Sequence, residues 1–157
     1  MGQKVHPTGF RLGGIYTWNS LWYSSKNYSR LLREDILLRK FILAELKEAS
    51  VEKIIIERPA GDLVLNIYTA KPGVVIGRSG AGVEELKKKL RQKFFTTKQS
   101  LNINIKEVER PSLSAALVLQ GVISDLERRV PFRRAVKQAI NKVQRAGAQG
   151  VKVIVSG

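Results

Sequence analysis

The 157-residue sequence contains no cysteine and a single histidine, His6. Disulfide frameworks, thiol nucleophiles and zinc sites built from Cys and His are therefore excluded together. Long apolar runs are also missing. The longest uncharged stretches, 12–25 and 111–124, have 14 residues each, whereas a membrane-spanning helix needs roughly 18 to 20 apolar residues. No apolar signal core follows the N-terminus, so export is not expected.

Acidic residues are few. The 28 Lys and Arg outnumber the 13 Asp and Glu, which gives a formal net charge of +15. No acid precedes Glu34 or follows Glu127, so both ends of the chain are basic and the middle is closer to neutral. A protein with this charge attracts polyanions, nucleic acid above all and anionic membrane less strongly. Because 43% of the residues are hydrophobic, the chain has the composition of a folded globular protein.

Hydrophobic periodicity predicts the elements of the first two thirds of the chain. Residues 1 to about 20 show little pattern and are expected to form an arm. Ser29 is expected to cap a helix that runs to about Glu48, with one side turned inward: Leu32, Ile36, Leu43 and Leu46. Segments 51–57 and 63–69 flank strong turn chemistry at 58–62, which predicts a β-hairpin. A helix to about Phe95 follows, with inward Val83, Leu86, Leu90 and Phe94, and then a strand in which Leu101, Ile103 and Ile105 alternate with polar residues.

The last third of the chain is predicted to be mainly helical. One helix, capped by Ser112, runs to about Arg129, and a second begins at Pro131 and stops near Gly147. Residues 151–155 alternate Val with other residues and predict a strand. A lone strand cannot pair with itself. It therefore joins the earlier sheet, pairs with another chain or belongs to a domain whose remainder is absent, and we favour the last of these.

The most specific local motif is Gly77-Arg78-Ser79-Gly80, between a short apolar turn and an amphipathic helix. Glycines at both ends let a backbone approach a phosphodiester closely, and the following helix offers free N–H groups. This is the arrangement of the GXXG loop in KH domains, which clamps about four nucleotides of a single strand. The four-residue string alone is usually just a turn, and it is the surrounding strands, helices and basic residues that favour the KH interpretation.

The glycines of this region do not have the spacing of nucleotide-binding motifs. No P-loop string is present, and Glu85 occupies the third glycine position of a dinucleotide fingerprint that would begin at Gly80. Three pairs of neighbouring carboxylates fit helix starts or an exposed strand better than acid and base catalysis: Glu34 with Asp35, Glu84 with Glu85, and Glu107 with Glu109. His6 has no partner base or nucleophile in the arm. No cofactor, no metal and no enzymatic turnover are therefore expected.

The second helix of the last third carries a series of cations that we call the cationic rail, namely Arg133, Arg134, Lys137, Lys142 and Arg145. A solvated helix face normally mixes both signs of charge, but this helix contains no acid, which favours contact with nucleic acid. A membrane-surface helix would need interfacial aromatics, and only Phe132 is present. Several aromatic residues lie near the N-terminus: Tyr16, Trp18, Trp22, Tyr23 and Tyr28. They are expected either to stack on bases or to pack the arm on the first helix.

Four stretches of the chain resemble the S-three family of bacterial-type small-subunit ribosomal proteins. They are 1–13 (MGQKVHPTGFRLG), 75–80 (VIGRSG), 127–135 (ERRVPFRRA) and 147–157 (GAQGVKVIVSG). The resemblance implies a type II KH domain followed by an α/β C-terminal domain, in the head of the small subunit. It also implies binding to small-subunit rRNA, contact with proteins S-ten and S-fourteen, and a share with S-four and S-five in the channel where mRNA enters.

By position, Arg133, Arg134 and Lys137 match the basic residues that this family uses on incoming mRNA and its downstream duplexes. The family continues past residue 157 into strands that complete the C-terminal sheet. We therefore expect an α+β protein with an arm at 1–16, a type II KH domain at 17–108 and a partial α/β domain at 109–157, made of two helices and one strand.

The expected function is that of a structural, RNA-binding constituent of a cytoplasmic or organellar ribosome, with no membrane partner. A free-standing KH-type RNA chaperone or regulator is the alternative. The residues expected to contact RNA are Lys4, His6, Arg11, Gly77, Arg78, Ser79, Gly80, Lys87, Lys88, Arg128, Arg129, Arg133, Arg134, Lys137 and Arg145.

Overall fold

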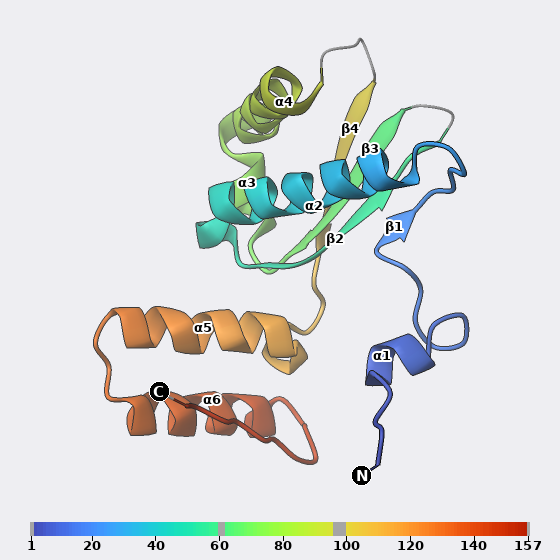
Figure 1. The fold of residues 1–157 in the computed structure, drawn as a ribbon. Helices are drawn as coiled ribbons and strands as arrows, with labels where there is room; N and C mark the ends of the chain where they lie inside the picture. Colours follow the sequence, from blue (N-terminus) through green and yellow to red (C-terminus); the bar gives the residue numbers. More distant parts are fainter. Residues whose placement is uncertain (1, 60–61, 96–99, 157) are drawn as a thin grey trace.

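A computed structural model describes residues 2–59, 62–95 and 100–156 and shows an α+β fold (Figure 1). Ala60 and Gly61 of the expected hairpin turn lie outside the described residues. The elements, in chain order, are α1 (Pro7–Phe10), β1 (Ser20–Leu21), α2 (Tyr28–Glu45), η1 (Lys47–Ala49), β2 (Val51–Glu57), β3 (Leu63–Thr69), α3 (Pro72–Ile76), η2 (Arg78–Gly80), α4 (Ala81–Phe94), β4 (Leu101–Glu107), η3 (Pro111–Leu113), α5 (Ala115–Glu127) and α6 (Phe132–Arg145).

The described strands form one sheet in the order β1-β2-β3-β4. The predicted hairpin is confirmed, because β2 and β3 pair antiparallel with Ile54 opposite Ile67. The predicted third strand is confirmed as β4, which runs parallel to β3. Parallel neighbours need a crossover connection, and α3 and α4 supply it. The two-residue strand β1, which periodicity did not predict, pairs parallel with β2 and so attaches the arm to the sheet.

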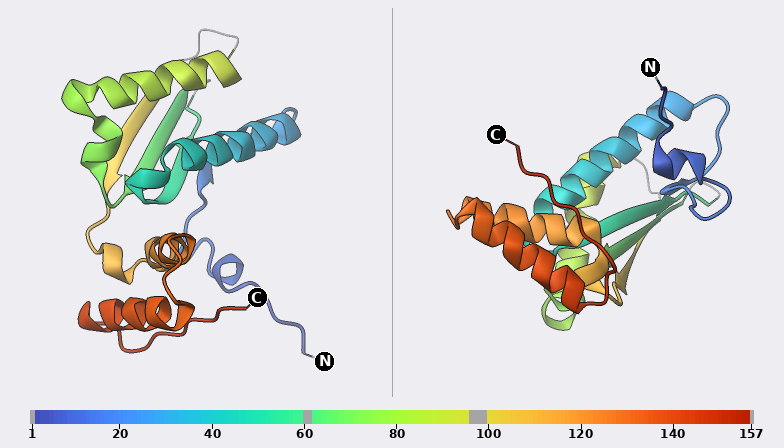
Figure 2. Two further views of the ribbon diagram at one scale, coloured as in Figure 1. Left: turned by 90° about the vertical axis from the view of Figure 1, so that its left-hand side faces the viewer. Right: turned by 90° about the horizontal axis from the view of Figure 1, so that it is seen from below.

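Two helices, α2 and α4, cover the same face of the sheet (Figures 1 and 2). The core between them is built from residues that alternate along the strands and recur at helical spacing on the helices. It contains Leu38, Ile42, Val51, Ile54, Ile56, Leu63, Leu65, Ile67, Leu86, Leu90 and Leu101. The inward positions predicted for α4 are confirmed at Leu86 and Leu90, while Val83 and Phe94 are partly buried.

The predicted inward side of α2 is wrong at two of its four positions. Ile36 and Leu43 are exposed, while Leu32 is partly buried and Leu46 packs against the core. The residues buried on this helix are Asp35, Leu38 and Ile42. Periodicity misplaced part of the face because it counts only apolar residues, and the buried face carries a carboxylate. The helix also begins at Tyr28 after Asn27, which forms no side-chain cap, so the predicted cap at Ser29 is not observed.

The last third of the chain contains two helices, α5 and α6, that pack against each other beyond one end of the sheet (Figure 1). Ser114 rather than the predicted Ser112 precedes α5, because Pro111–Leu113 form the separate turn η3. The side-chain amide Nε2 of Gln120 donates to the Val51 carbonyl at 2.8 Å and links α5 to the sheet. Gly147, at φ +93, follows α6 and ends it as predicted.

The predicted strand at 151–155 is wrong for the described structure. Residues 151–156 belong to no helix or strand. The reason is the absence of a partner: the described strands form one sheet, and this segment runs back beside α6, away from the sheet edges (Figures 1 and 2). Alternation of Val residues gives strand propensity, but a ladder of hydrogen bonds still requires a neighbouring strand.

Candidate nucleic-acid interface

The loop between α3 and α4 has the backbone that its sequence predicts. Gly77 and Gly80 adopt φ angles of +69 and +84, and Ser79 also has a positive φ of 53. Three left-handed residues in four reverse the chain within one turn, and glycine is the residue that does so without strain. The helix α4 then begins at Ala81, so its first N–H groups follow directly on this loop. The geometry fits a site where backbone approaches a phosphodiester.

A third glycine, Gly82, sets how closely α3 and α4 approach. A Cβ atom at this position would lie 2.5 Å from the Val75 carbonyl oxygen and 3.1 Å from the Ile76 carbonyl oxygen. No side chain fits there without moving backbone. Sequence reasoning missed this role because it tested the glycine only as part of a nucleotide motif. The available signal was a glycine in the first turn of a helix, where it has a propensity cost.

The basic residues of α4 fall into two classes. Lys87 donates to Glu84 Oε1 at 3.0 Å, and Lys89 is 3.1 Å from both Glu45 Oε2 and Glu85 Oε1. Hydrogen bonds to Glu85 and then Glu45 raise the pKa of Lys89. Lys88 is exposed and forms no ion pair with the described acids. The two lysines predicted to contact RNA therefore differ in their availability for a phosphate. Lys88 is open to one, while Lys87 has a local carboxylate partner.

The cationic rail is exposed along its length on α6, and it continues into the turn that precedes this helix. Arg128, Arg129, Arg133, Arg134 and Lys137 are all exposed and form no ion pair with a described acid. Ala135 and Ala139 are the buried residues that face α5. Small residues there allow close packing, so the cations project on the outer side of the helix pair.

Two local features around this turn are unfavourable for folding. Arg129 has a positive φ of 63, a conformation that costs a non-glycine residue about 1 kcal/mol. The first turn of α6 carries Arg133 and Arg134 and no acid, with no side-chain cap, so cations lie at the positive end of the helix dipole. The second of these costs is electrostatic, and an anion bound at this turn would offset it.

The arm is attached to the sheet at Asn19–Trp22. The Asn19 carbonyl accepts the Ile56 N–H at 2.9 Å, and the Leu21 carbonyl accepts the Arg58 N–H at 3.4 Å. Before this attachment, Lys4, His6 and Arg11 are exposed. Nδ1 of His6 accepts the Gly9 N–H at 3.3 Å and caps α1, while Arg11 donates to the Pro7 carbonyl at 2.9 Å. His6 therefore has a structural role at the start of α1.

Asp35 is the buried centre of this attachment. Its side chain is fully buried and accepts from Ser20 Oγ and Trp22 Nε1, each at 2.8 Å. Arg58 approaches the other carboxylate oxygen with Nε at 3.2 Å and Nη2 at 2.7 Å. One carboxylate thus joins the arm, α2 and the end of β2. Sequence reasoning assigned Asp35 to the helix dipole, and no local signal revealed the distant donors.

The predicted RNA-contacting residues lie on three separate surfaces. The loop at 77–80 with Lys88 is on the part of the molecule that contains the sheet, the rail is on α6, and the arm residues lie on the side opposite the turn between α5 and α6 (Figures 1 and 2). The surfaces therefore suit one extended polyanion or several segments of it, rather than a single pocket.

The described residues contain no group of three or more His, Cys, Asp or Glu placed to hold a metal ion. Among the same residues, no helix has the length and apolar character to cross a membrane. A shallow, open hollow of about 380 Å³ is lined by four residues of α6: Gln138, Asn141, Lys142 and Arg145. Two of these residues, Lys142 and Arg145, are members of the cationic rail.

Comparison of the sequence with known proteins finds two matching families and many similar proteins. A KH domain family matches residues 37–113, and the family "Ribosomal protein S3, C-terminal domain" matches residues 122–157. The chain is 50% identical over 157 residues to small ribosomal subunit protein uS3 of Enterococcus faecalis, covering 100% of this chain and 71% of that protein. Against uS3 of Myxococcus xanthus the identity is 48%, covering 100% and 70%. Against uS3 of Lactobacillus helveticus it is 50%, covering 100% and 69%.

Proposed function

The chain belongs to the small ribosomal subunit protein uS3 family, and on that premise we propose that it is a structural, rRNA-binding constituent of the small ribosomal subunit, without enzymatic turnover. The observation that carries the proposal is the left-handed loop at 77–80 in front of α4, within a chain of charge +15. A backbone that can approach phosphate, on a strongly basic protein, suits RNA binding by phosphate contact. A cytoplasmic ribosome is the proposed location, and an organellar one is the alternative.

The division of labour follows the domains that we propose: an arm at 1–16, a type II KH domain at 17–108 and a partial α/β domain at 109–157. The loop, the arm and Lys88 contact small-subunit rRNA. The cationic rail faces mRNA in the channel where it enters, with proteins S-four and S-five, while S-ten and S-fourteen are neighbours in the head. The support for the rail is its lack of acids and its exposed arginines, together with the unfavourable local features at Arg129 and the start of α6.

The test of this division is the triple variant Arg133→Ala, Arg134→Ala and Lys137→Ala in small subunits. Alanine is a good helix former, so the helix is expected to persist. We expect slower translation of a message with a stable hairpin, with little change on an unstructured message. The control variant, Lys40→Ala with Lys47→Ala, removes exposed cations of α2 and η1. Equal slowing of both messages, or failure of the triple variant to enter subunits, would assign the rail to rRNA assembly.

A free-standing KH-type RNA chaperone or regulator is the competing function. It binds RNA through the same loop but does not remain with ribosomal subunits. Sedimentation of the protein through a salt-washed gradient distinguishes the two. We expect it to travel with small subunits, and recovery only at the top of the gradient would favour the chaperone.

A further inference from the structure

The face of the sheet opposite α2 and α4 is uncovered by any described helix (Figures 1 and 2). The residues that alternate with the core on β2, β3 and β4 therefore lie on an open surface. Strand register arranges them in cross-strand rows. Tyr68 of β3 lies opposite both Lys53 and Lys106, and Asn66 lies opposite Ile55 and Asn104. We call the first of these rows, Lys53, Tyr68 and Lys106, the sheet triad.

The sheet triad places two ammonium groups around one phenol ring. Lys53 Nζ lies 4.6 Å and Lys106 Nζ 5.5 Å from the centroid of the Tyr68 ring. Both lysines are exposed, and neither forms an ion pair with a described acid. Cation–π contact holds each ammonium near the ring, but two like charges beside one ring repel each other. An anion at the ring edge would remove that repulsion and accept a hydrogen bond from the phenol hydroxyl.

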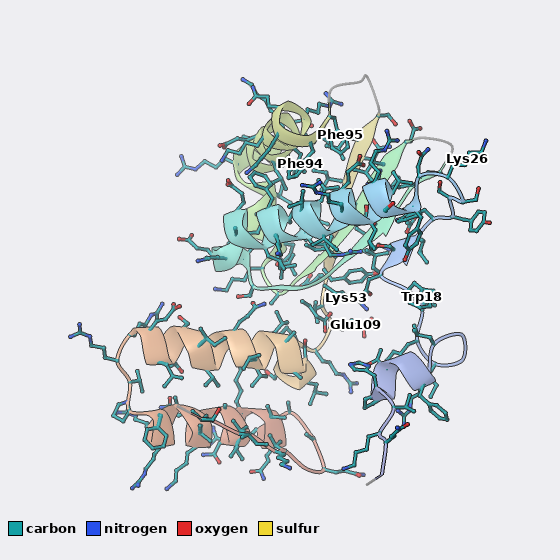
Figure 3. All side chains as sticks on the ribbon, in the orientation of Figure 1. Trp18, Lys26, Lys53, Phe94, Phe95 and Glu109 are labelled. Carbon is teal, nitrogen blue, oxygen red and sulfur yellow. The ribbon has the colours of Figure 1, made fainter. Side chains whose placement is uncertain are left out.

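Glu57, an acid on this face, is already engaged in a hydrogen bond. Glu57 Oε1 accepts from Asn66 Nδ2 at 2.7 Å, and Asn66 Oδ1 in turn accepts from Asn104 Nδ2 at 3.0 Å. Because an ionised carboxylate can only accept, it fixes the orientation of both amides. Asn66 is buried, so this chain of hydrogen bonds is a fixed part of the surface. The Glu57 carboxylate thus accepts a hydrogen bond from Asn66 and forms no ion pair with the lysines of the triad. Lys53 and Glu109 both lie at the end of the sheet nearest α5 (Figure 3).

We propose that the sheet triad is a second RNA-binding site, which holds a backbone phosphate of single-stranded RNA on the open face of the sheet. The lysines neutralise the phosphate, the Tyr68 hydroxyl donates to it, and the exposed Asn104 contacts the adjacent nucleotide. The site lies on the opposite face of the sheet from α4 and is therefore distinct from the loop at 77–80. This inference rests on the proposed RNA-binding function and adds a surface to it.

The test measures binding of the full chain to a fluorescent oligouridylate over a series of salt concentrations. The variant is Lys53→Gln with Lys106→Gln, which removes both charges and leaves shorter, polar side chains in their place. The matched control is Lys40→Gln with Lys47→Gln, which lowers the net charge equally on the helix side. We expect the triad variant to make the logarithmic salt slope less negative by about 0.7, the contribution of the single phosphate that both lysines neutralise on a single strand. The control should change it much less, and Tyr68→Phe should weaken binding without changing the slope.

The outcomes separate the two hypotheses. A wild-type slope near zero would contradict RNA binding by phosphate contact and thus the proposed function. A normal wild-type slope with equal effects of the triad and control variants would overturn the triad site alone. If the triad variant binds oligouridylate like the control but subunits carrying it lose a neighbouring protein, the face is a protein contact and the triad proposal is wrong. Thermal melting of both variants checks that the sheet remains folded.

Discussion

Gly82 is the residue near the phosphate loop that has no room for a side chain, because a Cβ atom there would overlap the Val75 carbonyl. We expect Gly82→Ala to lower the free energy of unfolding by about 2 kcal/mol, the range of an overpacked site. For a chain of this length this is a fall in Tm of about 6 °C. The control is Gly121→Ala in α5, where nothing lies within 4 Å of the added Cβ. It should be neutral or slightly stabilising, and a similar loss in both variants would contradict the argument.

The phosphate loop can be tested without replacing its glycines, whose positive φ angles make any substitution strained. Arg78 and Ser79 are already non-glycine, and Asp tolerates the left-handed conformation that Ser79 adopts. We expect Arg78→Glu with Ser79→Asp to keep the melting temperature and to reduce RNA affinity at least tenfold, because the variant places two anions where a phosphate would bind. Fluorescence anisotropy with a single-stranded RNA measures it. Unchanged affinity at unchanged Tm would show that the loop is only a turn.

At the scale of elements, the attachment of the arm depends on one buried carboxylate. We expect Asp35→Asn to cost about 3 kcal/mol, because it leaves the largely buried Arg58 without its charged partner. The arm should also become accessible to protease before the sheet unfolds. Glu34→Gln is the control, since Glu34 lies 3.3 Å from the same Arg58 Nη2 but its side chain is 34% exposed, and partly exposed pairs contribute less than about 1 kcal/mol. Equal losses in chemical denaturation would show that Asp35 is not the main anchor.

Elements whose signals are local were predictable from sequence. The hairpin strands 51–57 and 63–69 have turn chemistry between them, and β4 has clean alternation, so all three were confirmed. The loop at 77–80 was predictable because its left-handed backbone requires glycine. Features that depend on distant partners were not. The face of α2 depends on donors from Ser20, Trp22 and Arg58, and a strand at 151–155 depends on a neighbour.

The same distinction applies to the candidate site. Exposed cations such as Arg133 and Lys137 could be identified from the lack of acids around them. The separation of Lys87, paired with Glu84, from the unpaired Lys88 needed side-chain positions. The sheet triad needed the register of three strands, because Lys53 and Lys106 are far apart in the sequence and become neighbours only across Tyr68.

At the scale of the whole molecule, the charge of +15 makes salt act in opposite directions on the free protein and on its RNA complex. Screening relieves repulsion within the free chain, so its Tm should rise between low and moderate sodium chloride. The complex should weaken over the same range, with a logarithmic slope of about −4 if roughly six phosphates of a single strand are neutralised. Thermal melts and anisotropy titrations in matched buffers measure both effects. A free-protein Tm that falls with salt would contradict the repulsion argument.

The segment 151–156 has a further consequence for how the free protein behaves in storage. It combines alternating Val residues with an Ile154 that is 75% exposed, and its backbone has no strand partner among the described residues. Such a stretch is a template for cross-β growth between molecules, and Lys152 is the charge that interrupts it. Lys152→Val should therefore shorten the lag before thioflavin-positive fibrils appear. Since salt screens repulsion between molecules as well as within them, the buffer that gives the highest melting temperature should also give the shortest shelf life.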